Sequence, residues 1–350
     1  MLEYLIPILI FTLFTFIVTL ILYPFYIKFL KKLKAWKKIR ETAGTGEKST
    51  IFIKLHWHKA GVPTMWGGLF LLVMLIMVGI SLLLQHFDWI THSLWNQQET
   101  YIILFWFFSM GVIGLVDDIL NVRDIGKIKG LNIKAKMFGM VLFSAWIAYR
   151  FYRKLGIDYI NLRPFADKIE IWLFSPLLVF ISTITIVNAI NITDGLDGLA
   201  GGMSSVLLVV LAVATFLNQT YIATTVLWVC VAMLIAFMFY NMYPAKVFMG
   251  DSGAFALGGI VAATLHLLNM RIWIFIPFCI LFALFMLELC SSGLQMTWKK
   301  VFKRKLFPIA PFHHYLERKG MPECSIVMRL WFVQGILALA AIVILMGQYM

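Results

Sequence analysis

The stretch "NAINITDGLDGLAGG", residues 188–202, interrupts a long apolar part of the chain with two asparagines, two aspartates and four glycines. Its polar side chains recur at every third position, whereas an α-helix turns by about 100° per residue, so one unbroken helix could not present all of them on one face. We expect Asn188 and Asn191 on the inner face at the end of one helix. Asp194 then lies in a turn, and Asp197 caps or opens the next helix. Two ordinary helix caps in a loop are the alternative.

The composition is typical of a membrane protein. Of the 350 residues, 61% are hydrophobic and 13% are charged, whereas charged residues make up about a quarter of an ordinary soluble domain. A membrane-spanning helix needs about 20 mainly apolar residues. Ten candidate runs lie at about 4–26, 63–85, 100–116, 136–152, 171–190, 199–217, 220–240, 253–268, 272–295 and 326–348. The predicted fold class is therefore an all-α polytopic integral membrane protein with about ten transmembrane helices, in a single domain over residues 1–350.

The basic residues predict an orientation. On this layout, 24 of the 30 Lys and Arg residues follow the first, third, fifth, seventh and ninth apolar runs. Basic loops stay in the cytoplasm, so both termini are predicted outside. The basic segment at about 27–62 suits the anionic lipid at a membrane surface. We therefore expect membrane lipid, and no nucleic acid, as the partner of these lysines.

Carboxylates and histidines gather at the predicted cytoplasmic ends of the helices. "GLVDDILNVRD" contains Asp117 and Asp118, "YPAKVFMGDSGA" contains Asp251, and "LFPIAPFHHYLERKG" contains His313 and His314. Carboxylates within or beside membrane spans are costly and so mark functional sites. Together with the opening stretch, these motifs predict one active-site cleft at the cytoplasmic face.

Each motif also has a plainer interpretation. Asp117 and Asp118 would point about 100° apart on a helix and so serve different partners, or they are solvated helix-end carboxylates. "MGDSGA" predicts a glycine turn at a helix N-terminus, whose N–H groups favour anions. With Asp251 as an oxygen ligand for Mg²⁺, this turn would form a diphosphate site. The adjacent histidines would donate to phosphate or be plain loop residues, and Glu288, inside the ninth run, should pair with a polar neighbour.

These motifs resemble the phospho-N-acetylmuramoyl-pentapeptide transferases, a branch of the polyprenyl-phosphate N-acetylhexosamine-1-phosphate transferase superfamily. The resemblance rests on "NAINITDGLDGLAGG", "LVDDILNV", "NMYPAKVFMGDSGAFALGG" and "APFHHYLERKG", and extends from about residue 60 to the end. It implies Mg²⁺-dependent transfer of phospho-MurNAc-pentapeptide from UDP-MurNAc-pentapeptide to undecaprenyl phosphate, giving lipid I and UMP. The location implied is the bacterial cytoplasmic (inner) membrane, and a homodimer stays open.

The resemblance and the motifs together predict the site residues. Catalytic roles fall to Asp117, Asp118, Asp251, His313 and His314. Asp251 and Asn188 are the expected Mg²⁺ ligands. The expected substrate-binding residues, with Phe248 stacking on uracil, are Thr64, Lys136, Asn191, Asp194, Asp197, Lys246, Phe248, Gly250 and Gln295.

Three motifs depart from the family pattern. "VPTMWGG" carries Val62 and an extra Trp66, and Tyr315 replaces a third histidine. Asn121 stands where the family has a lysine, four residues after Asp117. We expect another cation to supply the missing charge. The nearest candidates in sequence are Arg123, Lys134 and Lys136.

The sequence leaves mechanism and class open. The lipid phosphate could attack directly, with Asp117 or Asp118 taking a residual proton, or the reaction could pass through an aspartyl-phosphate. Direct attack is favoured because a phosphate monoester, with a second pKa of about 6, is mostly dianionic at neutral pH. A transferase of another UDP-N-acetylhexosamine is a close alternative. An ion-coupled transporter or lipid flippase would instead place its polar residues near the middle of the membrane.

Overall fold

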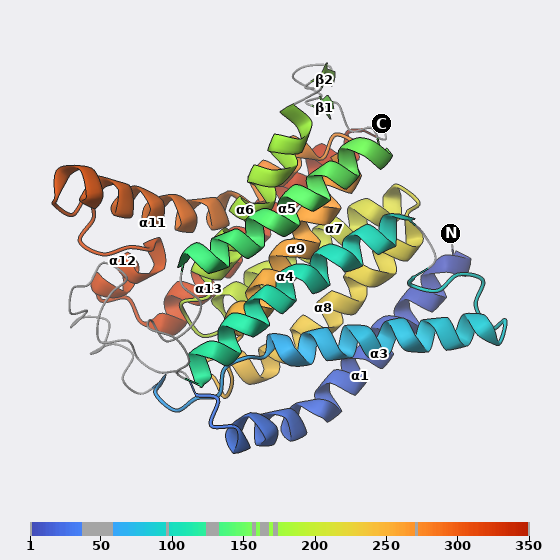
Figure 1. Ribbon diagram of the computed structural model, residues 1–350, viewed down its shortest axis with the longest axis horizontal. Coiled ribbons are helices and arrows are strands. Elements are labelled where there is room, and N and C mark those ends of the chain that lie inside the picture. The colour runs from blue at the N-terminus through green and yellow to red at the C-terminus, as the bar shows by residue number, and fades with distance from the viewer. Residues whose placement is uncertain are drawn as a thin grey trace.

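The computed structural model is a bundle of long helices (Figure 1). It describes residues 2–36, 59–95, 98–123, 133–155, 159–161, 168–170, 174–269 and 272–348. The long helices are α1 (Leu2–Lys32), α3 (Gly67–His86), α4 (Gln98–Val122), α5 (Ile133–Leu155), α6 (Ser175–Thr193), α7 (Leu199–Leu217), α8 (Tyr221–Asn241), α9 (Gly250–Asn269), α11 (Ala283–Phe302) and α13 (Glu323–Met346). Two short helices are α10 (Phe275–Leu281) and α12 (Phe312–Arg318), and two short strands are β1 (Tyr159–Asn161) and β2 (Lys168–Glu170).

The predicted membrane fold is confirmed, with two refinements among the ten expected spans. Within the described ranges, eight helices are long and apolar enough to cross a membrane. The run at 272–295 is broken, because α10 and α11 meet at Phe282 with a bend of 66°. The run at 136–152 forms α5, whose apolar part, Ala135–Tyr149, is shorter than that of the other spans. Lysine near its start and basic residues near its end limit that apolar part.

Helix α9 is the centre of the bundle. Its apolar window is 94% buried, whereas that of α1 is 22% buried. The helix packs chiefly against α4 and α6, and small residues make this close approach feasible. A Cβ on Gly258 would lie 2.5 Å from the Cα of Val187, and one on Gly259 would lie 2.6 Å from the carbonyl oxygen of Trp106. Any larger side chain at these positions would push α9 away from its neighbours.

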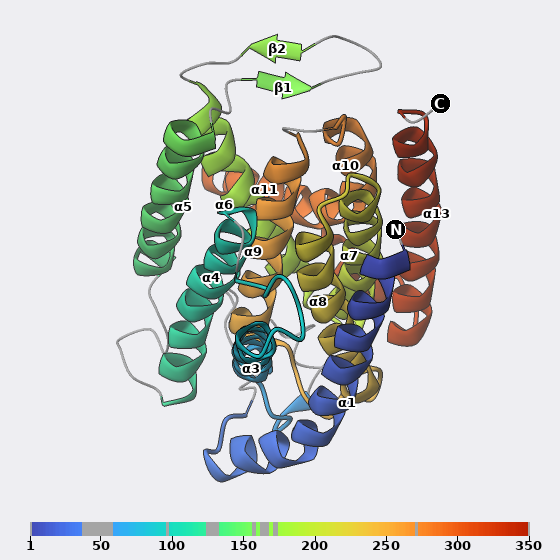
Figure 2. The same cartoon turned by 90° about the vertical axis from the view of Figure 1, so that its right-hand side faces the viewer.

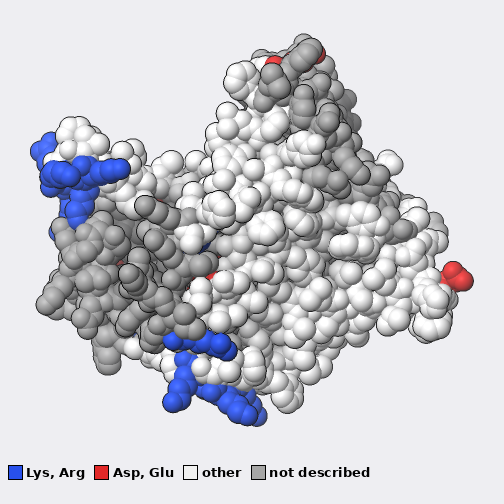
Figure 3. Space-filling model, viewed as in Figure 1, with Lys and Arg blue, Asp and Glu red and all other residues white. Residues whose placement is uncertain are grey.

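The two ends of the bundle differ. The antiparallel β1–β2 hairpin lies at one end, and the last turn of α1 lies at the other (Figure 2). Both chain termini also lie away from the last turn of α1 (Figure 1). Lys and Arg gather over the ends of α1 and α11 (Figure 3), where the last turns carry Lys31, Lys32, Lys299 and Lys300. The basic extension of the first helix predicted from the sequence is thus present as far as Lys32, and the rest of segment 27–62 is described only at 33–36 and 59–62.

Candidate active site

Asp118 holds the N-terminus of α9. Its carboxylate accepts the backbone N–H groups of Asp251 and Ser252, at 3.1 and 3.0 Å, and the Ser252 hydroxyl at 2.6 Å. Gly250 opens the helix with φ +74°, and a Cβ there would lie 2.7 Å from Asp118 Oδ2. The expected glycine turn and anion site at this helix N-terminus are therefore present. The anion that occupies the site is Asp118 itself, so the turn is not open to a diphosphate as the sequence suggested.

Asp117 points to a different partner, as the angle between adjacent helical residues requires. Its carboxylate lies 2.8 Å from the ammonium of Lys136, at the start of α5, and the same ammonium also pairs with Asp251. Asp117 and Asp118 are buried, whereas the side chains of Lys136 and Asp251 are 22% and 23% exposed. We call Asp117, Asp118, Lys136, Asp251 and Ser252 the Lys136 cluster. It joins α4, α5 and α9 and keeps one accessible side.

The Lys136 cluster suits a divalent cation. Its three carboxylates and one ammonium leave two negative charges, and Mg²⁺ is commonly bound by one or two carboxylates together with substrate phosphates. Asn188 donates its amide nitrogen to the Ile184 carbonyl at 2.8 Å, which leaves its side-chain oxygen without a partner among the described residues. No three His, Cys, Asp or Glu side chains in the described ranges form a metal site. Asp117 and Asp251 fit the one or two carboxylates that Mg²⁺ commonly uses, and water and phosphate oxygens would complete the shell of such an ion.

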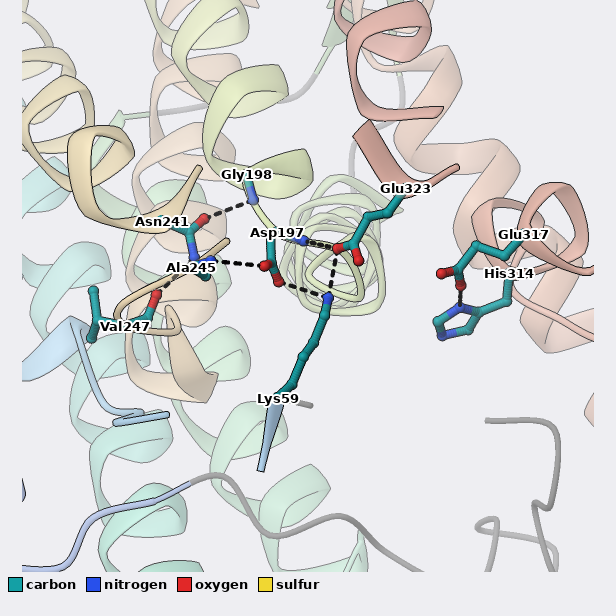
Figure 4. Close-up of polar contacts among 9 residues, drawn as sticks. All are labelled: Lys59, Asp197, Gly198, Asn241, Ala245, Val247, His314, Glu317 and Glu323. Atoms are coloured by element: carbon teal, nitrogen blue, oxygen red, sulfur yellow. Dashed lines mark hydrogen bonds and ion pairs between the residues drawn. The ribbon is translucent and has the colours of Figure 1, made fainter. Parts of the chain in front are cut away.

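A second lysine-bridged group joins the turn after α6 to the start of α13. Lys59 pairs with Asp197 at 2.7 Å and with Glu323 at 2.5 Å (Figure 4). Glu323 also accepts the backbone N–H of Asp197 at 2.7 Å, and Asp197 accepts the N–H of Ala245 at 2.9 Å. We call Lys59, Asp197 and Glu323 the Lys59 cluster. Their side chains are 4%, 3% and 10% exposed, so this cluster is closed.

Two carboxylates keep Lys59 charged despite its burial. Burial acts to lower the pKa of Lys59, but the charges of Asp197 and Glu323 outweigh it and raise the pKa above its usual value. The sequence analysis did not single out Lys59. Its position five residues before Thr64 carries no signal of its own, because a lone lysine in a basic segment is indistinguishable from its neighbours.

The opening stretch folds largely as expected. Helix α6 ends at Thr193, Asp194 follows at its C-terminus, and α7 begins at Leu199. One expectation is wrong in detail: Asp197 does not cap α7. Gly198, with φ +79°, occupies the cap position, and its N–H donates to the side chain of Asn241 at 3.0 Å. Asp197 instead joins this turn to Lys59 and Ala245.

The two histidines lie on α12 and have separate acidic partners. His313 Nδ1 lies 3.0 Å from Glu288 of α11, which confirms the polar partner expected for Glu288. His314 Nδ1 lies 2.6 Å from Glu317. The His313 ring packs on the turn after α6, since a Cβ on Gly195 would lie 2.1 Å from its Nε2. Helix α12 is thereby held against the end of α6.

The structure brings only some of the predicted substrate-binding residues close to the Lys136 cluster. Lys136 and Gly250 lie in or against it, and Asn191 and Asp194 lie at the nearby end of α6. Phe248 is 6% exposed, and its backbone bonds to Pro63 and Trp66. The roles of all these residues toward substrate stay predictions.

Three other predicted residues have structural neighbours of their own. Gln295 bonds to the backbone of Leu306 and Phe307 and so holds the loop after α11. The backbone N–H of Thr64 donates to Ala35 at 2.9 Å. Lys246 is exposed and lies at a separate groove with lysines of α1.

The structure also shows the surroundings of the positions that depart from the family pattern. Trp66 is fully buried and stacks on Phe70 and Phe237, with ring centroids 4.5 and 4.3 Å apart, so the extra residue fills the core. Lys136 is the cation beside Asp117, in agreement with the charge expected to compensate for Asn121. Tyr315 has the ammonium of Lys319 4.9 Å from its ring centroid.

The polar groups of α4, α6, α9 and α12 meet at one end of the bundle. Asp118 bonds to the N-terminus of α9, Asp197 bonds to the loop before α9, and His313 contacts the turn after α6. A transporter is expected to place such residues near mid-membrane. The contacts instead lie where α4 and α6 end and α9 begins, rather than at the middles of these helices.

Comparison with known proteins agrees with this geometry. The profile of the family described as Glycosyl transferase family 4 matches residues 100–269, which include Asp117, Lys136 and Asp251. The phospho-N-acetylmuramoyl-pentapeptide-transferase of Geobacillus kaustophilus is 32% identical over 336 residues, or 94% of this chain and 95% of the relative. That of Staphylococcus carnosus is 34% identical over 329 residues, or 91% and 93%. That of Borrelia hermsii is 33% identical over 351 residues, or 95% and 93%. Such similarity over nearly the whole length shows that the chain belongs to the phospho-N-acetylmuramoyl-pentapeptide-transferase family.

Proposed function

We propose that this protein transfers phospho-MurNAc-pentapeptide from UDP-MurNAc-pentapeptide to undecaprenyl phosphate. An oxygen of the lipid phosphate attacks the phosphorus that carries the sugar, and the bond from that phosphorus to the UMP oxygen breaks. The products are lipid I, which contains the new diphosphate, and UMP. This is the membrane step that starts the lipid-linked part of peptidoglycan synthesis.

The Lys136 cluster is the observation that carries this proposal. Phosphoryl transfer depends mainly on positioning and on stabilising charge. The cluster provides a fixed ammonium between two carboxylates, partly exposed and at one end of a membrane bundle. A soluble nucleotide substrate and a phosphate on a membrane lipid could both reach such a place.

Asp117 and Asp251 are the residues that would hold Mg²⁺, with Asn188 as a further oxygen donor. When bound, the ion would neutralise diphosphate oxygens and the charge that develops on the leaving UMP. Lys136 would then contribute a positive charge to the phosphates as well as to the carboxylates.

The contacts favour different roles for the adjacent aspartates. Asp118 accepts three hydrogen bonds from the first turn of α9, so we assign it to positioning Asp251. Asp117 pairs with the ammonium of Lys136, whose side chain is 22% exposed, so it faces the accessible side of the cluster and we assign it the residual proton. Direct attack by the lipid phosphate requires only a group that accepts a residual proton, because that phosphate is already largely ionised.

We also infer the orientation from charge. The Lys136 cluster and the basic ends of α1 and α11 would face the cytoplasm, and both termini would lie outside, in the bacterial cytoplasmic membrane. The positive side would then meet anionic lipid headgroups and the anionic nucleotide substrate.

Release of UMP tests the proposed reaction. Purified protein with undecaprenyl phosphate, UDP-MurNAc-pentapeptide and Mg²⁺ should form UMP and lipid I in equal amounts. Omitting the lipid should abolish UMP release. UMP formation without lipid would indicate hydrolysis, and failure with this substrate but turnover with another UDP-N-acetylhexosamine would assign the protein to a different branch.

A further inference from the structure

A basic groove lies at the end of α1, apart from the Lys136 cluster. It encloses about 470 Å³ between the last turns of α1, the segment 61–63 and the end of α8. Its apolar surface comes from side chains that include Ile27, Pro63 and Tyr240. Lys28, Lys31 and Lys246 also line it.

The lysines of the groove have no anionic partner within the described ranges. No carboxylate lines the groove there, and no ion pair joins its lysines to an acid of those ranges. Lys28 and Lys31 are three residues apart on α1 and therefore share a face. Lys246 approaches them from the loop before α9, so three positive charges from two segments surround one apolar surface.

The surface of α1 beside the groove is apolar. Ile21, Phe25 and Phe29 are 58%, 65% and 53% exposed and follow one another at helical spacing. These side chains suit lipid acyl chains, whereas the lysines at the helix end suit a charged headgroup. The combination matches the two halves of an anionic phospholipid.

We propose that this groove binds an anionic phospholipid of the bilayer. Lys28, Lys31 and Lys246 hold its phosphate, and its acyl chains lie along α1 beside Phe25 and Phe29. Lysines near a membrane surface attract anionic lipid, and an apolar groove gives the lipid a defined binding position. The acceptor is a less suitable occupant, because its phosphate must reach the Lys136 cluster and none of the residues that line the groove belongs to that cluster.

The bound lipid would connect α1 to the start of α9. Pro63 lines the groove, and its carbonyl accepts the N–H of Phe248 at 2.8 Å. Two residues further along, the backbone nitrogen of Met65 lies 3.1 Å from where a Cβ on Gly250 would sit. A headgroup that ties α1 to Lys246 therefore stabilises both segments that flank the glycine turn at Asp251.

Lipid binding to the full-length protein in detergent, measured by native mass spectrometry, tests the proposal. The variant is Lys28→Gln with Lys31→Gln, and the matched control is Lys32→Gln with Lys300→Gln. The control removes two exposed lysines that do not line the groove, one of them adjacent to Lys31. A charge-conserving pair, Lys28→Arg with Lys31→Arg, tests rescue. The lipids are phosphatidylglycerol and phosphatidylcholine.

We expect the wild type and the control to bind phosphatidylglycerol in preference to phosphatidylcholine. The glutamine pair should weaken phosphatidylglycerol binding at least tenfold, and the arginine pair should restore it. An equal loss in the control, or equal binding of phosphatidylcholine, would overturn the proposal. Displacement of phosphatidylglycerol by equimolar undecaprenyl phosphate would also overturn it, because the groove would then be a binding site for the acceptor. Displacement by equimolar inorganic phosphate would overturn it too, because the groove would then be a small-anion site.

Discussion

The Lys136 and Lys59 clusters are built alike but differ in access. In each, one lysine from one segment joins carboxylates of two others, with ion pairs of 2.8 Å for Lys136–Asp117 and 2.7 Å for Lys59–Asp197. The Lys136 side chain is 22% exposed, whereas that of Lys59 is 4% exposed. The same chemical group is therefore open in one place and sealed in the other.

The difference indicates a division of roles. A buried ion pair costs free energy to desolvate, and removing one partner leaves an uncompensated charge. The Lys59 cluster therefore holds together the turn after α6, the start of α13 and the loop before α9. Under the proposed function, the Lys136 cluster would instead exchange its internal ion pairs for contacts with Mg²⁺ and phosphates.

Asp251→Asn should have the largest effect, because it removes the accessible carboxylate of the Lys136 cluster. We expect turnover to fall by about a thousandfold or more, or about 4 kcal/mol of barrier. The protein should still fold in detergent, since the Asp118 contacts to the start of α9 use backbone groups. Initial rates of UMP release measure the effect, and Asp88→Asn, at the far end of α3, is the control. Retained activity with unchanged Mg²⁺ dependence would contradict the assignment.

Lys59→Gln should affect stability first. It leaves Asp197 and Glu323 facing each other without a cation, which costs about 3–5 kcal/mol for a buried pair. The thermal unfolding midpoint should fall by roughly 5 °C or more. Because the pKa of Lys59 is raised, its stabilising charge persists below that pKa and is lost only as pH rises through it. The loss caused by the variant should thus be similar between about pH 6 and 9. An unchanged midpoint, compared with exposed Lys300→Gln, would show that the cluster does not stabilise the fold.

Asn121→Lys should be tolerated within about tenfold in rate, which corresponds to about 1.4 kcal/mol. The reason is that Asp117 already has Lys136 at 2.8 Å. Initial rates at saturating Mg²⁺ provide the measurement. A rate far above the wild type would show that the site lacks a charge and that Lys136 does not replace it.

Ser252→Ala should have the smallest effect. It removes one of three hydrogen bonds to Asp118 and leaves both backbone donors. A loss of about 1 kcal/mol would lower turnover about fivefold. Ser205→Ala, which removes a hydroxyl bonded within α7 at 2.8 Å, is the matched control. Loss as large as that of Asp251→Asn would mean that the hydroxyl has a direct part in the reaction.

Features that depend on local sequence were predictable. Periodicity and composition predicted the membrane class, the break after Asn191 and the glycine turn at Gly250, because these follow from neighbours along the chain. The different directions of Asp117 and Asp118 followed from helix geometry alone. A buried Glu288 needed a partner, and His313 provides it.

Features that depend on long-range packing were not predictable. Nothing near Lys59 in the sequence points to Asp197 or Glu323, because any cation and any acid would make an equivalent pair. The sequence predicted an anion at the start of α9 but not that Asp118 would fill the position. The bend at Phe282 lies within a continuous apolar run, so the local sequence does not indicate it. At the bend, the carbonyl of Leu281 accepts a hydrogen bond from the side chain of Gln334, which is 53 residues further along the chain on α13.

The most direct test of the central claim compares Lys136→Gln with Lys59→Gln in the same assay. Both variants remove one lysine charge from a pair of carboxylates, and UMP release is expressed per folded molecule. The account predicts that Lys136→Gln loses at least about a hundredfold in rate, as for removal of a charge-stabilising donor, with little change in thermal stability. Lys59→Gln should lose stability but retain most of its rate per folded molecule. The reverse pattern, or equal loss of rate in both, would contradict the assignment of the chemistry to the Lys136 cluster.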